Sequence, residues 1–189
     1  MLNVPFPDQE ERKFMKTMLR TILAGAISCL PAIYAQSTGS TTVSVTVGAE
    51  ASVTVNTSTT TLTSSTAFAD YTGTTSLTYK IRTTPSSGAG TITAQVTTDF
   101  SPAGGPSVAS PPSAGDALKY TCTVASPGTG CSGAQTSSTT AATSVATFGA
   151  DAHSATAGNS ASVAWALTND PAYKVASYSA TVTFTISAT

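Results

Sequence analysis

Charged side chains are scarce in this chain, making up 9% of its 189 residues. After residue 35 four basic residues stand against six acidic ones, a net charge of −2, and none of the basic residues cluster into a patch. A protein that binds nucleic acid needs such a patch to neutralise phosphates, so we expect no nucleic-acid partner. Disordered chains combine low hydrophobicity with high net charge, and neither property applies here.

Histidine is scarcer still, since His153 is the only one. A Ser-His-Asp hydrolase would need His153 and an acid such as Asp151 to converge on a serine. The chain has no G-x-S-x-G nucleophile elbow, and His153 lies in a loop of small residues, GADAHSATAG. We therefore expect no enzyme and no cofactor, and a secreted hydrolase ranks as the last alternative.

The three cysteines are Cys29, Cys122 and Cys131. In CTVASPGTGC the turn residues Ser126-Pro127-Gly128 let the chain reverse, so we expect a disulfide between Cys122 and Cys131. A metal site would need a second cysteine pair or a histidine cluster, and we expect none. The acidic residues are scattered singly, so a structural calcium ion in a loop remains only an alternative.

Residues 16–35, KTMLRTILAGAISCLPAIYA, read as a secretory signal peptide. Lys16 and Arg20 precede a short apolar stretch, and cleavage is expected after Ala35. Residues 1–14 form a polar extension before Met15, explained either by a misplaced start codon or by a long positive region. Lipidation of Cys29 is a further alternative. The apolar stretch is too short to span a membrane and no second one follows, so we expect a secreted or surface domain over residues 36–189 after periplasmic transit.

Apolar and polar residues alternate in several segments of the remaining chain. Period-two patterning with one apolar face is typical of sheets packed on one side, and β-branched residues favour strands. Strands are predicted at 41–47, 51–56, 76–83, 90–98, 116–124, 143–148, 160–168 and 177–189. Loops rich in Gly, Pro and Ser separate them at 84–90, 101–116, 126–140 and 150–159. The expected fold is a single all-β domain, an antiparallel immunoglobulin-like β-sandwich of about seven to nine strands.

Aromatic side chains offer candidates for ligand contact. Trp165 lies between Val163 and Leu167 on an apolar face, which favours the core. Tyr71 (in ADYTGTT) and Tyr173 (in NDPAYK) have loop-like contexts, so they are the candidate residues for contact with a glycan. Lysine–asparagine bonds, as in some surface sandwiches, would need Lys80 or Lys174 beside Asn56, Asn159 or Asn169. Lys80 falls on an outward face, which favours an ordinary solvated lysine.

The C-terminal stretch SYSATVTFTISAT resembles the closing strand of secreted bacterial surface and pilin-like sandwiches, such as spore-coat-U-type and WxL-type domains. In those domains a small residue and a tyrosine lead into an alternating Val/Thr strand. The preceding ASVAWALTNDPAYKVA extends the likeness to a tryptophan strand followed by a loop. The resemblance covers this region alone and implies a related architecture.

These observations predict a secreted, non-enzymatic structural or adhesive surface protein. The specific hypothesis is strand donation, in which the alternating segment 41–47 pairs with a sheet edge of a neighbouring copy and builds a fibre. Expected partners are other surface proteins or copies of the chain itself. The alternative is a polysaccharide-binding module that uses Tyr71 and Tyr173.

Overall fold

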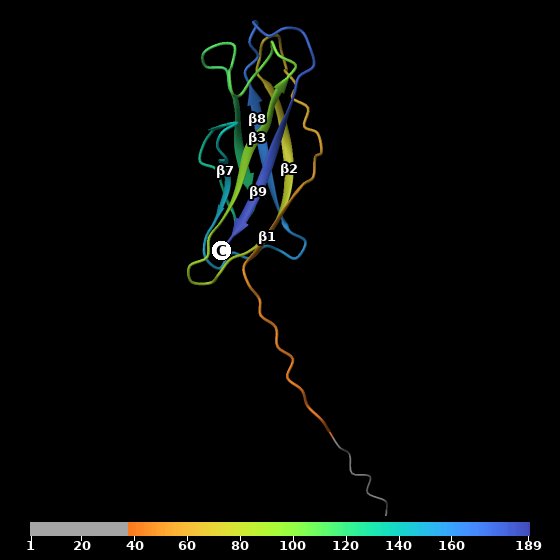
Figure 1. Ribbon diagram of the computed structural model, residues 1–189, viewed down its shortest axis with the longest axis vertical. Coiled ribbons are helices and arrows are strands. Elements are labelled where there is room, and N and C mark those ends of the chain that lie inside the picture. Colours follow the sequence, from red (N-terminus) through yellow and green to blue (C-terminus); the bar gives the residue numbers. More distant parts are fainter. Residues whose placement is uncertain (1–37) are drawn as a thin grey trace, which may run out of the picture. The chain divides into compact units, whose positions relative to one another are not determined.

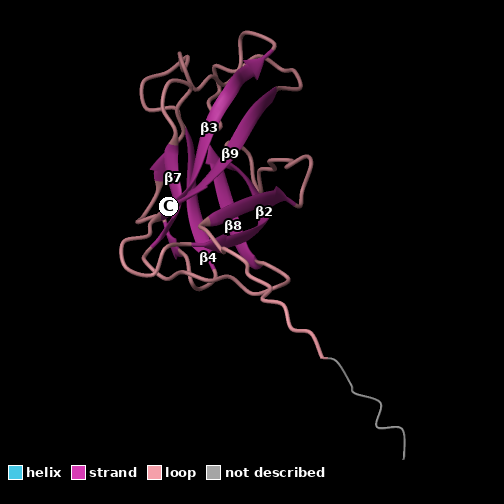
Figure 2. Ribbon diagram, turned by 60° about the horizontal axis from the view of Figure 1, so that its bottom comes forward, coloured by secondary structure: helices cyan, strands magenta, loops and turns pink. Residues whose placement is uncertain are grey.

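The computed structural model describes residues 38–189, in which nine strands and no helix occur (Figures 1 and 2). Residues 46–189 form one compact unit. The predicted signal peptide, the extension 1–14 and Cys29 lie outside the described residues. The strands are β1 (Glu50–Val55), β2 (Tyr71–Arg82), β3 (Gly90–Ser101), β4 (Leu118–Val124), β5 (Thr129–Gly130), β6 (Gln135–Thr136), β7 (Thr143–Phe148), β8 (Asn159–Leu167) and β9 (Ser179–Ala188).

The strands form two sheets. The first has the order β1-β2-β8-β4-β6, and the second has the order β5-β7-β3-β9. Every pairing between these strands is antiparallel. In both ribbon views β3 and β9 lie side by side (Figures 1 and 2). This arrangement confirms the predicted all-β antiparallel sandwich and its strand number.

The core lies between the two sheets and consists of the apolar residues that alternate along the strands. On β2 these are Leu77, Tyr79 and Ile81, which expose 4% or less of their surface. On β3, β4 and β8 the buried positions are Ile92, Ala94, Val96, Leu118, Tyr120, Ala161, Val163, Trp165 and Leu167. Period-two patterning therefore assigned these faces correctly, because successive side chains of a strand point to opposite sides of the sheet.

Trp165 belongs to this core, as its sequence context predicted. It exposes 6% of its surface, and its ring lies 5.1 Å from that of Tyr120. The indole Nε1–H donates a hydrogen bond of 2.8 Å to the buried hydroxyl of Thr75. A buried indole N–H without an acceptor would destabilise the fold, so the Thr75 hydroxyl stabilises the buried position of Trp165 by accepting this hydrogen bond.

The prediction of a strand at 41–47 is wrong for the isolated chain. Residues 41–47 have no regular secondary structure, and Val43, Val45 and Val47 expose 90%, 84% and 61% of their surface. Alternation provides an apolar face, but a strand also needs a neighbour for its N–H and C=O groups. No partner strand for this segment occurs among residues 38–189.

Other boundaries also differ from the sequence prediction. Tyr71 is the first residue of β2 rather than a loop residue, and the predicted loop 126–140 contains the two-residue strands β5 and β6. Strand β7 confirms the prediction at 143–148, but its buried residues do not alternate strictly. The register between β3 and β7 shifts at Ile92/Thr93, so the consecutive residues Val145 and Ala146 are both buried. A bulge of this kind breaks strict alternation.

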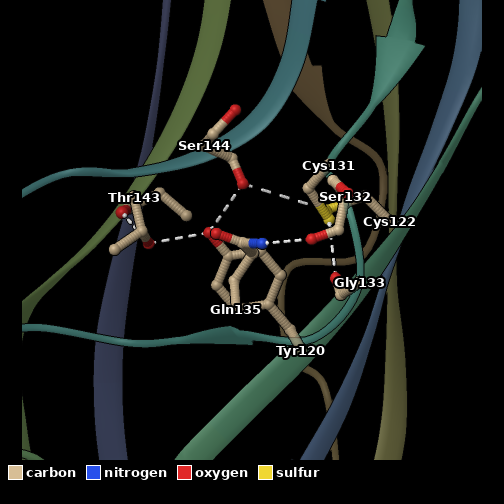
Figure 3. Close-up of a disulfide and its surroundings, with 9 residues drawn as sticks. Tyr120, Cys122, Cys131, Ser132, Gly133, Gln135, Thr143 and Ser144 are labelled. Atoms are coloured by element: carbon tan, nitrogen blue, oxygen red, sulfur yellow. Dashed lines mark hydrogen bonds between the residues drawn. A yellow bond between two sulfur atoms is a disulfide. The ribbon is translucent and has the colours of Figure 1, made fainter.

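The predicted disulfide joins Cys122 to Cys131, with Cα atoms 5.4 Å apart (Figure 3). Cys122 lies on β4 in the first sheet, and Cys131 directly follows β5 in the second. The disulfide therefore links the two sheets at one side of the sandwich. Two hydrogen bonds lie close to it: the hydroxyl of Tyr120 donates to the carbonyl of Ser144 over 3.0 Å, and the Gln135 amide donates to the carbonyl of Ser132 over 2.8 Å.

Replacing both cysteines by alanine is expected to lower the free energy of unfolding by about 2–3 kcal/mol, because the short cross-link restricts the unfolded chain. Urea unfolding followed by circular dichroism measures this loss. The wild-type protein unfolded under reducing conditions is the matched control and should show a similar midpoint. A double variant as stable as the oxidised wild type would contradict a stabilising role.

Candidate functional site

The outermost strands of the two sheets are β1, β6, β5 and β9. Strands β5 and β6 have two residues each, whereas β9 has ten and pairs only with β3. Natural edge strands usually carry charges, proline or bulges that prevent pairing with another chain. The sequence of β9, SATVTFTISA, has no charge and no proline, and its pairing with β3 is regular from Val182 to Ala188. Register shifts at Val96/Thr98 and Thr98/Ser101 interrupt the pairing only near the start of β9. From Val182 onward, β9 is therefore an edge with little protection against a further strand.

An open groove of about 1000 Å³ runs beside β9. Ala180, Val182 and Phe184 of β9 form one wall, and Val55 with the segment 57–62 forms the other. Trp165 and Thr75 belong to the lining at the core. The side chains of Val182 and Phe184 pack against the core but remain only partly buried.

The groove exists because the first sheet is incomplete at its β1 edge, which faces the β9 edge of the second sheet. Strand β1 ends at Val55 and pairs with β2 only over Leu77–Arg82. Over the other half of β2, the segment after β1 makes a bridge at Thr63 and Thr72 and a hydrogen bond from Asn56 N–H to the Ser76 carbonyl. No regular strand therefore covers the interior between this half of β2 and β9.

The wall formed by residues 57–62 is tied to the core through hydroxyl groups. The Thr60 and Thr75 hydroxyls lie 2.6 Å apart, and Thr75 also accepts the hydrogen bond from Trp165. Gly73 permits the close approach of this segment, because a Cβ at that position would lie 2.7 Å from the Thr61 carbonyl oxygen. The groove thus has an anchored wall on the side opposite β9.

Both candidate tyrosines, Tyr71 and Tyr173, line this groove although they are about a hundred residues apart in sequence. Tyr71 also packs against the core. The Tyr173 hydroxyl donates a hydrogen bond of 3.0 Å to Asp116 Oδ2. Burial raises the pKa of Tyr173, and the hydrogen bond to Asp116 and the nearby carboxylates raise it further. Tyr173 is therefore a neutral hydrogen-bonding group and not a phenolate.

Two loops contact each other beside the groove, at Gly104 and Gly105 of one and at Lys174 and Tyr178 of the other. The Tyr178 ring packs directly over Gly105, where any side chain would collide with it, and the Lys174 N–H donates to the Gly104 carbonyl over 2.8 Å. Phe68, also in the lining, is 66% exposed and has a φ of +57°. A non-glycine residue in this region of backbone space is uncommon.

Asp99 fixes the loop that follows β3. Its carboxylate accepts hydrogen bonds from the Ser107 hydroxyl and from the N–H groups of Phe100, Val108 and Ala109, at 2.7–3.0 Å. Burial by itself raises the pKa of Asp99, but these four hydrogen bonds outweigh it, so the pKa lies below its ordinary value. The long loop predicted at 101–116 is therefore built around one carboxylate.

Among the remaining sequence candidates, His153 and Asp151 lie side by side. The His153 Nδ1 is 3.7 Å from Asp151 Oδ1 and 2.8 Å from the Asp151 backbone oxygen, and both side chains are exposed. The side-chain amides of the three asparagines donate hydrogen bonds to the Thr78 hydroxyl (Asn56), the Ser126 carbonyl (Asn159) and the Ala69 carbonyl (Asn169). None of these partners is a lysine.

Within residues 38–189, no group of three or more His, Cys, Asp or Glu residues could hold a metal ion. The same part of the chain contains no helix with the length and hydrophobicity that a membrane span requires.

Sequence reasoning missed the groove itself. Alternation identified the apolar face of each strand, but it carries no information about which strand lies at an edge or how completely its face is covered. Leu62, Phe68 and Phe100 line the groove, but none of them belongs to an alternating apolar pattern that would single it out in the sequence.

Comparison with known proteins adds no identity. No family model, no curated protein and no solved structure matches this chain.

Proposed function

We propose that this protein is a secreted, non-enzymatic structural protein of the cell surface that assembles into fibres by strand donation. In this arrangement the N-terminal segment of one copy pairs with a sheet edge of another. The observation that carries the proposal is the segment 41–47, in which Val43, Val45 and Val47 alternate with hydroxyl residues yet remain largely exposed. In an extended conformation, valines at period two would share one apolar face, which is the pattern that pairing with a sheet requires.

The free edge of the sandwich supplies the complementary half of the argument. Unpaired N–H and C=O groups on an edge strand recruit an extended segment through main-chain hydrogen bonds, and pockets for alternate side chains add specificity. The chain has both parts, a segment with alternating exposed valines and a long sheet edge with no further neighbouring strand among residues 38–189. Few charges are present to oppose contact between copies.

Deletion of residues 36–47 tests this function. The truncated protein is expected to fold as a monomer and to form no fibres, because the deletion removes the donor and leaves the unit 46–189 almost intact. Electron microscopy of the exported protein measures fibres, and circular dichroism reports the fold. Fibres that persist after the deletion would overturn the proposal.

Polysaccharide binding is the second candidate, and one observation favours it: Tyr71 and Tyr173 line the same groove. Aromatic rings and the adjacent polar groups of Asn169 and Asp170 suit a sugar, which presents both apolar and hydroxyl surfaces.

This second function predicts retention of the protein on a glycan array. Replacing Tyr71 or Tyr173 by alanine should weaken retention. The control is Thr91→Ala, which changes an exposed residue on the outer face of β3 and should leave retention unchanged. A protein that binds no glycan on the array would count against this function.

A further inference from the structure

We propose that the acceptor for strand donation is β9 together with the groove beside it, occupied by residues 43–47 of a second copy. This inference rests on the proposed function and specifies its site. It places Val43, Val45 and Val47 opposite the three apolar residues of β9 that line the groove, namely Ala180, Val182 and Phe184.

The other sheet edges are poorer acceptors. Strands β5 and β6 are two residues long, too short to align a segment of five to seven residues. Strand β1 begins at Glu50, whose carboxylate forms an ion pair of 3.1 Å with Arg82. A strand that docks beside β1 at this end would have to desolvate or displace these charges. Strand β9 offers ten uncharged residues.

The donor and the groove match in spacing. Alternate residues of a strand repeat every roughly 6.6 Å, so three valines at period two fall opposite three groove-facing residues of β9. Centring the register on Val45 and Val182 places all three valines over the groove. Successive residues of a strand point to opposite faces, so Ser44 and Thr46 must point outward in this register.

The outward face supports the same register. On the outer side of β3 and β9, hydroxyl groups pair across the strands, with Thr97 and Thr183 at 3.0 Å and Thr91 and Ser187 at 3.1 Å. Ser44 and Thr46 of a donated strand would extend this hydroxyl surface beyond β9. Cross-strand hydroxyl pairs contribute modestly to sheet stability, while the buried valines contribute the larger part.

Chain connectivity favours a second copy over the chain's own segment. Residues 41–47 enter the sandwich through Gly48 and Ala49 at Glu50, the first residue of β1. The groove begins at Val55, the opposite end of that strand, and continues along residues 57–62. The segment thus joins the strand at the end remote from the groove, whereas a second copy can approach the open groove directly.

Cysteine cross-linking of the full exported chain tests the assignment. In an antiparallel docking centred on Val45 and Val182, Ser44 lies opposite Thr183, and in a parallel docking it lies opposite Thr181. Directly opposed residues have Cα atoms about 4.5–5.5 Å apart, within the range of a disulfide. The double variants S44C/T183C and S44C/T181C therefore report both the acceptor and the strand orientation.

We expect one of these two variants to lose its monomer band and form a ladder on non-reducing gels, which collapses on reduction. The control S44C/T123C, with an exposed cysteine on β4, should stay monomeric under denaturing conditions. If neither variant forms a ladder while deletion of 36–47 still abolishes fibres, strand donation stands and β9 is the wrong acceptor. Dimers of T183C alone would replace the inference with β9–β9 pairing, and fibres that survive the deletion overturn the function and the acceptor together.

Discussion

Val45→Asp is expected to abolish assembly, whereas Thr46→Asp one residue away leaves assembly intact. In the proposed complex Val45 enters the groove, and burying an unpaired carboxylate there costs several kcal/mol. Each 1.4 kcal/mol weakens association about tenfold, so the loss should reach a factor of at least about a hundred. Thr46 points outward in the same register, where a charge remains in water.

The monomer provides the internal control for this comparison. Val45 exposes 84% of its surface in the single chain, so Val45→Asp has no core contact to remove. Surface substitutions of this kind usually change stability by less than about 0.5 kcal/mol. Analytical ultracentrifugation of both variants measures assembly, and urea unfolding verifies that the sandwich is unchanged. Equal assembly by both variants would show that the valine face is not buried between copies.

Trp165→Ala is expected to cost about 3–5 kcal/mol of folding stability, the range found when large buried aromatic residues are truncated. The substitution removes a side chain that is 6% exposed, its contact with the Tyr120 ring and its hydrogen bond to Thr75. It also leaves a cavity where Trp165 lines the groove. Marginal domains of this size rarely tolerate such a loss, so the variant should unfold at a much lower urea concentration.

Trp165→Phe separates packing from hydrogen bonding at this position. Phenylalanine retains an aromatic ring but cannot donate to Thr75, which keeps the Thr60 hydroxyl as a partner at 2.6 Å. We expect a smaller loss, of which a net hydrogen bond accounts for about 1 kcal/mol. If Trp165→Ala were no more destabilising than Trp165→Phe, the tryptophan would not be the packing element that its burial indicates.

The sequence predicted most strands and the inward face of each, because alternation follows directly from strand geometry. Leu77, Tyr79 and Ile81 are examples, as are Val163 and Trp165 with their neighbours on β8. The sequence-based prediction failed where the pairing with a neighbouring strand decides which residues are buried. Val145 and Ala146 are both buried through a register shift opposite β3, and nothing in TSVATF alone specifies that shift.

At the candidate site, too, the sequence predicts the local features while the pairing of distant segments decides how they are arranged. The loop-like contexts of Tyr71 and Tyr173 made them candidates, but their convergence on one groove depends on a strand and a loop far apart in the chain. Segment 41–47 has the composition of a strand and yet is unpaired, because pairing requires a partner that residues 38–189 do not supply. A local pattern cannot encode the presence of that partner.

The amino-acid sequence by itself determined the all-β class, the disulfide between Cys122 and Cys131 and the division of each strand into an apolar and a hydroxyl face. These properties arise from residue type and spacing, which act over a few neighbouring residues. Only the tertiary structure decided that β9 is an edge, that Val182 and Phe184 are half-covered and that a groove lies beside them. Edges and coverage depend on the order in which distant strands pair, and long-range pairing is invisible to a two-residue period.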